Sequence, residues 1–269
     1  MIRNNIIKWL RMLTQHQYLE LTTRGNAAIT AALSIVPSGQ KILIPAEGGW
    51  LHYRSAPKKK GIIAEEVVCD DARINLADLR KKLSADPQAV FLYQNPGGYF
   101  APQPMKEIYD LCHQHNCKVI MDVSGSIGTP LADGRYADII VCSFGQWKLV
   151  EAHVGGFVSC RDKSVFEKLV IEKLHDESAY SKIMEKIQGL SARIAFLEQK
   201  RKTVVRDLRD CDIIYPHDKG FVVVVKYTTV GEKEKIINYC TTHQLPWTEC
   251  PRYIRVNNPA ISIELKQVN

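Results

Sequence analysis

Two polar groups that could carry out chemistry follow apolar, strand-like segments in the middle of the chain. Residues 119–121 lead to the carboxylate of Asp122, and residues 139–142 lead to the hydroxyl of Ser143 and, five residues later, to the amine of Lys148. Ligands bind at the carboxyl ends of strands in open α/β sheets, so we expect Asp122 and Lys148 to face one shared site. A helix-capping Asp and a solvated surface Lys are the alternative interpretation of the same residues.

Other expected strands also end in loops of small and polar residues. The strand 41–45 is followed by two glycines and Trp50, and the strand 89–93 by the polar, glycine-rich loop 94–99. Near residue 25 a small-residue turn opens into a helix, whose first backbone N–H groups lack intrahelical partners and can bind an anion. These loops could surround one ligand site.

The elements that must position these groups alternate between strand-like and helical patterns up to about residue 160. This alternation predicts an α/β fold, a mostly parallel sheet with helices on both faces, in a large domain of residues 1–175. Residues 176–269 are expected to form a long linking helix and a small α+β domain. The expected C-terminal elements are helices at 165–174, 180–208 and 236–243 and strands at 220–227, 252–256 and 261–265.

Composition excludes several classes of protein. The 269 residues are 45% hydrophobic and 24% charged, and no apolar run approaches the roughly 18 to 20 residues that a membrane helix needs. The N-terminus lacks the apolar core of a signal peptide, so we expect a cytoplasmic protein without a membrane partner.

The eight scattered cysteines suit reduced thiols. Cys112, His113, His115 and Cys117 have no second ligand pair of matching spacing, so we expect no metal site.

The net charge of +7 permits an anionic ligand. The basic runs 58–60 and 200–202 are not interleaved with aromatic residues, so we interpret them as solvated faces and expect no nucleic-acid partner.

The order of these features resembles the fold-type-I pyridoxal-phosphate enzymes, and within them the DegT/DnrJ-type sugar aminotransferases. That family has a small-residue turn at a helix start, a proline-ended strand followed by an aromatic residue, an Asp turn, and Ser-Phe-x-x-x-Lys followed by Gly-Gly. The corresponding segments here are Arg24-Gly25-Asn26-Ala27, Pro45 to Trp50, Asp122-Val123-Ser124, and Ser143 to Lys148 with Gly155-Gly156. The resemblance covers roughly residues 20 to 160.

The resemblance implies that pyridoxal 5'-phosphate is the cofactor and that Lys148 forms the Schiff base with its aldehyde. The amine must be neutral to attack, which partial burial and nearby positive charge favour. Asp122 would bind the pyridine nitrogen and so make the ring an electron sink. Trp50 and Ser124 would lie on the two faces of the ring. Lys148 would then move the proton between the substrate and the cofactor.

The resemblance also implies a phosphate site at the helix start, formed by the backbone of Gly25 and Asn26 and by the hydroxyl of Ser143. Asn95 would bind the phenolic oxygen of the cofactor. Arg24 departs from the family's small hydroxyl residue, and its role stays open. Arg255 is the candidate for binding a substrate carboxylate, since a guanidinium can grip one with two parallel bonds.

The implied function is an aminotransferase that moves an amino group from an amino acid donor, glutamate by family resemblance, to a keto-sugar or similar carbonyl acceptor. The implied assembly is a homodimer. A pyridoxal-phosphate lyase or desulfurase is an alternative that needs a mobile nucleophilic cysteine, for which Cys250 beside Pro251 is the candidate. The other alternative is a non-catalytic descendant that binds a ligand or partner.

Overall fold

The larger of the two main sheets carries the polar strand ends. The computed structural model describes residues 2–268, and this sheet has seven strands in the order β1-β9-β8-β7-β6-β2-β3. Its strands are β1 (Tyr18–Thr22), β2 (Lys41–Pro45), β3 (Ile63–Val67), β6 (Val90–Gln94), β7 (Lys118–Asp122), β8 (Ile139–Ser143) and β9 (Gly156–Cys160).

Five adjacent strands of this sheet, from β3 through β2, β6 and β7 to β8, are parallel, and β9 pairs antiparallel with both β8 and β1. The strands β2, β6, β7 and β8 are almost wholly buried, as is expected when helices cover both faces. The predicted fold class is therefore confirmed. The structure adds β9, which the sequence analysis did not predict.

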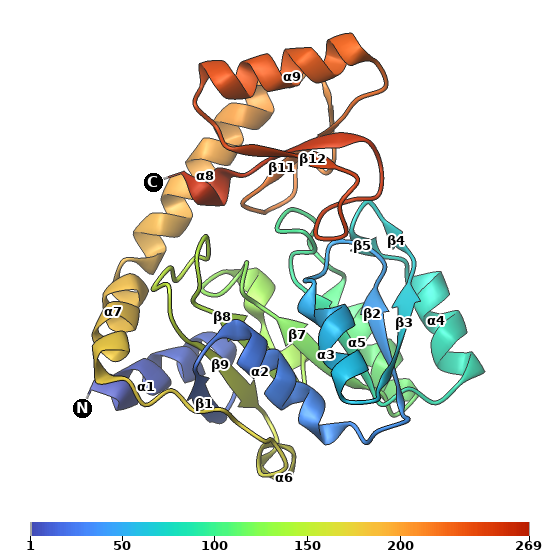
Figure 1. Cartoon of the computed structure of the whole chain (residues 1–269), viewed down its shortest axis with the longest axis vertical. Coiled ribbons are helices and arrows are strands. Elements are labelled where there is room, and N and C mark those ends of the chain that lie inside the picture. Colours follow the sequence, from blue (N-terminus) through green and yellow to red (C-terminus); the bar gives the residue numbers. More distant parts are fainter. Residues whose placement is uncertain (1, 269) are drawn as a thin grey trace.

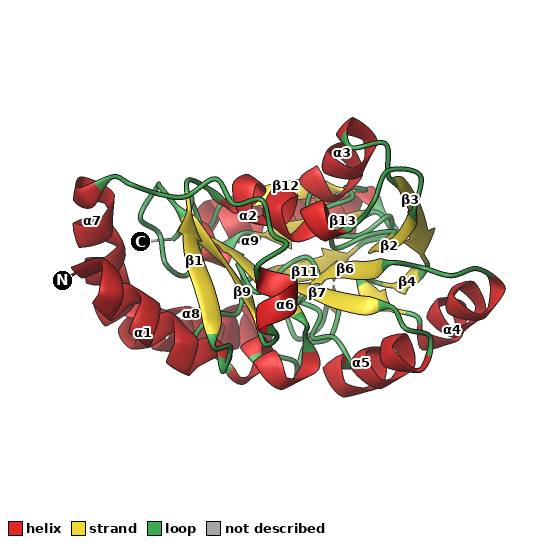
Figure 2. Cartoon of the chain, turned by 90° about the horizontal axis from the view of Figure 1, so that it is seen from below, coloured by secondary structure: helices red, strands yellow, loops and turns green. Residues whose placement is uncertain are grey.

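Helices cover the two faces of the sheet unequally (Figures 1 and 2). The buried side chains of α2 (Gly25–Ala32), α3 (His52–Lys59) and α6 (Lys163–Phe166) form one core with one face of the sheet. The buried side chains of α1 (Ile2–Thr14), α4 (Leu76–Ala85), α5 (Met105–Gln114) and α7 (Glu177–Gln188) form the other. The face that carries α2 and α3 is the one that holds the candidate site.

A smaller domain sits over the carboxyl ends of the parallel strands (Figure 1). Its sheet is antiparallel in the order β10-β11-β13-β12, and the long helix α8 (Leu190–Asp207) leads to it. Its elements are β10 (Asp212–Ile213), β11 (Val223–Lys226), α9 (Val230–Thr242), β12 (Trp247–Cys250), β13 (Ala260–Ile263) and the short helix η4 (Leu265–Gln267). The short hairpin of β4 (Cys69–Asp70) and β5 (Arg73–Ile74) and the single turns η1 (Leu33–Ile35), η2 (Pro130–Ala132) and η3 (Gly134–Tyr136) complete the fold.

Three predicted elements differ in the structure. The predicted helix 165–174 stops at Phe166, because the chain then runs beside β1, where the Leu174 N–H donates to the Leu21 carbonyl at 3.0 Å. The predicted helix 180–208 is two helices, α7 and α8 (Leu190–Asp207), divided at Gly189, a residue of low helix propensity. The predicted strand 252–256 is a loop that follows Pro251, which has no N–H to pair.

The packing of α7 and α8 bears on the domain boundary. Ile183 and Ile187 of α7 lie in the core of the large sheet, whereas Val204, near the end of α8, packs in the core of the small sheet. We therefore propose that the boundary falls within α8 rather than after residue 175. None of the helices between residues 2 and 268 has the length and apolarity that crossing a membrane requires.

Candidate active site

Asp122, at the end of β7, is buried with both carboxylate oxygens held. The backbone N–H of Ser124 donates to Oδ1 at 2.9 Å, and the hydroxyl of Tyr53 on α3 donates to Oδ2 at 2.7 Å. Burial, and then the charge of Asp122, raise the pKa of Tyr53 well above its usual value, which keeps its hydroxyl protonated as a donor. The orientation of the Asp122 carboxylate is thus fixed by two neutral groups.

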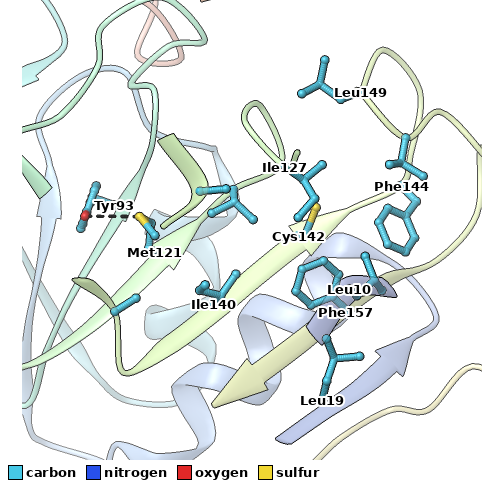
Figure 3. Close-up of a cluster of buried hydrophobic side chains, with 14 of the residues drawn as sticks. Leu10, Leu19, Tyr93, Met121, Ile127, Ile140, Cys142, Phe144, Leu149 and Phe157 are labelled. Carbon is cyan, nitrogen blue, oxygen red and sulfur yellow. Dashed lines mark hydrogen bonds between the residues drawn. The ribbon is translucent and has the colours of Figure 1, made fainter. Parts of the chain in front are cut away.

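The alternation of side chains along the strands decides which of them reach the site. Asp122 on β7 pairs in register with Val141 on β8, and both belong to the face that α2 and α3 cover. The residues one position away, Met121 and Cys142, point into the core on the opposite face (Figure 3). Burial raises the pKa of Cys142 well above its usual value, so its thiol is not a nucleophile for this site.

The ends of β7 and β8 are joined to the start of α2. The Ser143 N–H donates to the Ser124 hydroxyl at 2.8 Å, and the Ser143 hydroxyl accepts from the Gly145 N–H at 3.1 Å. Gly25 opens α2 against Ser143 so closely that a Cβ on it would lie 2.4 Å from the Ser143 Cβ. Only glycine fits there, and α2 begins without a side-chain cap. Its first backbone N–H groups therefore point toward the site without a competing side-chain acceptor.

Lys148 reaches the same site from the loop after β8. Its Nζ donates to the hydroxyl of Tyr99 at 2.6 Å and lies 5.3 Å from the centroid of the Trp50 ring. The Trp50 indole in turn donates to the side-chain oxygen of Asn26 at 2.9 Å. The backbone of Tyr99 has φ +68°, a conformation that costs a non-glycine residue free energy and is common where a side chain is held for function.

These groups line one cavity of about 190 Å³. Its lining brings together most of the predicted site residues with Arg24 and Tyr99. The lining residues are Arg24, Gly25, Asn26, Ile29, Trp50, Tyr99, Asp122, Ser124, Val141, Cys142, Ser143 and Lys148. Ala27 lines a neighbouring hollow beside α3 instead, together with Arg24 and Asn26.

A larger cavity of about 620 Å³ shares Trp50, Tyr99, Ser143 and Lys148 with the first one. Its remaining wall includes residues of the small domain, among them Arg252, Arg255, Glu264 and Lys266. The site is thus a small polar pocket in the large domain that opens into a wider cavity under the small domain.

Asn95 does not line the small cavity, contrary to its predicted role. Its side-chain N–H donates to the Leu131 carbonyl at 2.8 Å, and its side-chain oxygen accepts from the Gln103 N–H at 3.0 Å. The residue is fully buried, so both ends of its amide are committed to holding the loop after β6. This geometry supports a structural role for Asn95 rather than a ligand contact.

Arg255 lines the larger cavity, but its guanidinium is already engaged. Its two nitrogens Nε and Nη2 donate to Glu264 at 2.6 to 3.1 Å, and Nη1 donates to the Ile254 carbonyl at 2.7 Å. Arg255 is only 2% exposed. Glu264 therefore makes the two parallel bonds with Arg255 that the sequence analysis assigned to a substrate carboxylate.

Three residues of the site were missed in the sequence analysis. Tyr53 lies on α3, which contains Pro57 and has no clear helical pattern, and Tyr99 lay within a predicted loop without an assigned role. Lys266 comes from a turn at the end of the chain. Only Tyr99 had a usable signal, since it closes a glycine-rich loop at a strand end beside the expected site.

Comparisons with known proteins agree with this geometry. Residues 66–198 match the DegT/DnrJ/EryC1/StrS aminotransferase family, whereas no curated protein matches the chain in sequence. A solved DegT DnrJ EryC1 StrS aminotransferase from Brucella abortus has a similar structure, with a TM-score of 0.81 at 12% identity over 97% of this chain and 84% of that one.

Two further solved structures resemble the chain. One is a PLP-bound putative aminotransferase from Clostridium difficile 630, with a TM-score of 0.75 at 14% identity over 98% of this chain and 78% of that one. The other is a serine palmitoyltransferase from Sphingomonas wittichii, with a TM-score of 0.77 at 12% identity over 100% of this chain and 72% of that one. The fold thus supports more than one reaction. Residues 66–198 are thus similar in sequence to the DegT/DnrJ/EryC1/StrS aminotransferase family, and nearly the whole chain shares the fold of these solved structures.

Proposed function

We propose that the protein is a pyridoxal-phosphate-dependent aminotransferase, which moves an amino group from glutamate to a keto-sugar or a similar carbonyl compound. The observation that carries the proposal is that one small cavity is lined by Asp122, by Lys148 and by the start of α2. A carboxylate, an amine and an anion-binding helix start are the groups that this cofactor needs around it.

The residues present fit the cofactor in their chemistry. Gly25 leaves the α2 start in close contact with Ser143, which supports a phosphate site made of backbone N–H groups and a hydroxyl. Asp122, held by Tyr53 and Ser124, would hold the pyridine nitrogen protonated. Trp50 supplies a flat face on the same cavity.

Bound pyridoxal phosphate supplies an aldehyde that condenses with amines and a ring that withdraws electrons from the substrate α-carbon. Lys148 is the amine within reach, and it would also carry the proton from the α-carbon when it is free. Tyr99 would orient the Lys148 amine through its hydroxyl, at 2.6 Å. The larger cavity would hold the substrate, because it begins at Lys148 and is lined by polar and aromatic side chains.

The family resemblance supports a homodimer that acts in the cytoplasm as part of this proposal. All eight cysteines are free, which agrees with a reducing compartment.

The lyase or desulfurase alternative gains no support from the cysteines. Cys250 lies buried in the small domain, and burial raises its pKa. Cys142 contributes to the cavity lining, but it packs in the core on the opposite face of the sheet, and burial raises the pKa of its thiol well above the usual value. Neither thiol is a mobile, ionised nucleophile. The non-catalytic alternative is opposed by the shared placement of Asp122 and Lys148.

A spectrum of the purified protein with added pyridoxal phosphate tests the proposal. We expect a visible absorbance band that is absent in Lys148→Arg, a variant that keeps the positive charge but cannot condense with the aldehyde. Adding glutamate should bleach this band and release 2-oxoglutarate, and a keto-sugar should restore it. A protein that stays colourless would contradict the proposal, and sulfide release from cysteine would favour the desulfurase.

A further inference from the structure

The wall of the larger cavity that the small domain provides carries a buried cluster of charged residues, Arg255, Glu264 and Lys266. All three are less than 8% exposed, although such residues are seldom buried without a reason. Glu264 accepts from Arg255, from Lys266 at 2.9 Å and from the hydroxyl of Ser262 at 2.8 Å. The cluster contains two cations and one anion, so one positive charge is uncompensated.

Lys266 is the member of the cluster that can share its charge with a ligand. All three nitrogens of Arg255 already donate hydrogen bonds, to Glu264, Ser262 and the Ile254 carbonyl. The Lys266 ammonium has three donors, and its ion-pair partner among residues 2–268 is Glu264. The Lys266 Nζ lies 5.2 Å from the centroid of the Tyr99 ring and 5.5 Å from that of Trp147.

Lys266 and Lys148 lie at the same aromatic ring. The Lys148 Nζ is 4.9 Å from the centroid of the Tyr99 ring, and Lys148 and Lys266 both line the larger cavity. Within that lining, as the structure describes it, Glu264 is the one acidic residue among four cations: Lys148, Arg252, Arg255 and Lys266. A cavity with this imbalance attracts an anion, and it does so most strongly where the cation is shielded from water.

We propose that Lys266 is a specificity-determining residue that binds the carboxylate of the substrate. This inference rests on the proposed function, since it places the substrate in the larger cavity next to Lys148. A single excess positive charge matches a carboxylate, which carries one negative charge, better than a phosphate dianion. Exposed Arg252 is the competing candidate on the same wall.

The charge of Lys266 makes the binding depend on pH. Burial lowers the pKa of Lys266 to about 8; Glu264 opposes this shift, whereas Arg255 and Lys148 add to it. Lys266 is therefore positively charged below about pH 8 and loses its charge above it. Carboxylate binding should be strongest below this pH. At pH 8, binding of a carboxylate should be accompanied by proton uptake, because the ligand favours the charged form of Lys266.

Calorimetric titration with glutarate tests the assignment, because glutarate has carboxylates but no amino group to react. Glutaramide, its neutral diamide, is the matched control ligand. The protein is titrated both as purified and with pyridoxal phosphate added, in wild type, Lys266→Gln, Lys266→Arg and Arg252→Gln. The Lys266→Gln variant keeps the ion pair between Arg255 and Glu264, so it should fold. If it does not fold, Lys266→Arg still tests the assignment, because it keeps the positive charge.

We expect Lys266→Gln to weaken glutarate binding at pH 7 at least about tenfold, the scale of one lost charged hydrogen bond. Lys266→Arg and Arg252→Gln should bind within a few-fold of wild type, and glutaramide should not bind. Unchanged binding by Lys266→Gln, or a larger loss in Arg252→Gln, would overturn the assignment. A protein that binds glutarate through Lys266 but takes up no pyridoxal phosphate would contradict the proposed function alone.

Discussion

The two walls of the candidate site, one in each domain, hold their charges in different ways. On the wall of the large domain, Asp122 is held by a tyrosine hydroxyl and a backbone N–H, and Lys148 by the hydroxyl of Tyr99. On the wall of the small domain, Arg255, Glu264 and Lys266 hold one another. Neutral partners leave a charge available to a ligand, whereas the single carboxylate of Glu264 offsets only one of the two positive charges that it binds.

This difference suits the large-domain wall to catalysis and the small-domain wall to structural support. The large-domain wall can offer one carboxylate and one amine to a cofactor without first breaking an ion pair. The small-domain wall uses two of its three charges to fix its own structure and leaves only the excess charge of Lys266 for a ligand. Under the proposed function, the larger cavity has a reactive wall at Lys148 and a binding wall at Lys266, and both lysines lie near the Tyr99 ring.

Replacing Glu264 with Gln should have the largest effect on stability. The change leaves Arg255 buried without its ionic partner, which costs about 3–5 kcal/mol of unfolding free energy. Urea unfolding at pH 7 measures this loss. The matched control is Glu249→Gln on β12 of the small domain, whose pair with Lys233 lies at the surface and should contribute little to stability. Equal losses in the two variants would contradict the distinction between the walls.

The pH dependence of the unfolding free energy should also depend on the cluster of Arg255, Glu264 and Lys266. Burial alone would raise the pKa of Glu264, but the charges of Arg255 and Lys266 outweigh it and bring this pKa to about 2, against an ordinary 4.5. The lowered pKa contributes about 3 kcal/mol above pH 4.5, and this contribution is lost as the pH falls toward 2. Unfolding free energies measured between pH 2 and 6 should show this loss in wild type. In Glu264→Gln the unfolding free energy should change less steeply with pH over this range.

A smaller effect is expected from Tyr53→Phe on the large-domain wall. The change removes the hydrogen bond to the buried Asp122 carboxylate, which is worth about 1.5–3 kcal/mol because the acceptor is charged. Affinity for pyridoxal phosphate should fall together with the unfolding free energy. Tyr93→Phe is the control, since Tyr93 is equally buried but its hydroxyl faces the sulfur of Met121 on the other side of the sheet (Figure 3). If both variants behave like wild type, Tyr53 does not position Asp122.

The smallest effect should come from Tyr99→Phe, which removes only the hydroxyl that orients Lys148. We expect a loss of about 1 kcal/mol in transition-state stabilisation, which is a several-fold lower kcat with cofactor binding unchanged. Tyr253→Phe is the control, because the buried Tyr253 hydroxyl has no partner among the described residues. A loss of cofactor binding in Tyr99→Phe would show that the Tyr99 hydroxyl binds the cofactor itself and does not act by orienting Lys148.

The alternation of apolar segments and polar strand ends was enough to predict the sheet and the meeting of Asp122 with Lys148 in one cavity. The antiparallel strand β9 was missed because it begins at Gly156, the second residue of a glycine pair, and glycine weakens a strand pattern. Tyr53 and Lys266 could not be predicted, since neither carries a local signal and both reach the site only through tertiary packing. The misassignment of Arg255 has the same cause, because its partner Glu264 could be found only from the fold.

Reduction of the protein with borohydride in the presence of pyridoxal phosphate, followed by peptide mapping, tests the central claim most directly. Lys148 and Lys266 face the same Tyr99 ring, so the map distinguishes the reactive wall from the binding wall. We predict that the cofactor is attached to Lys148 and that the peptide with Lys266 is unmodified. Attachment to Lys266, or to neither lysine, would contradict the account.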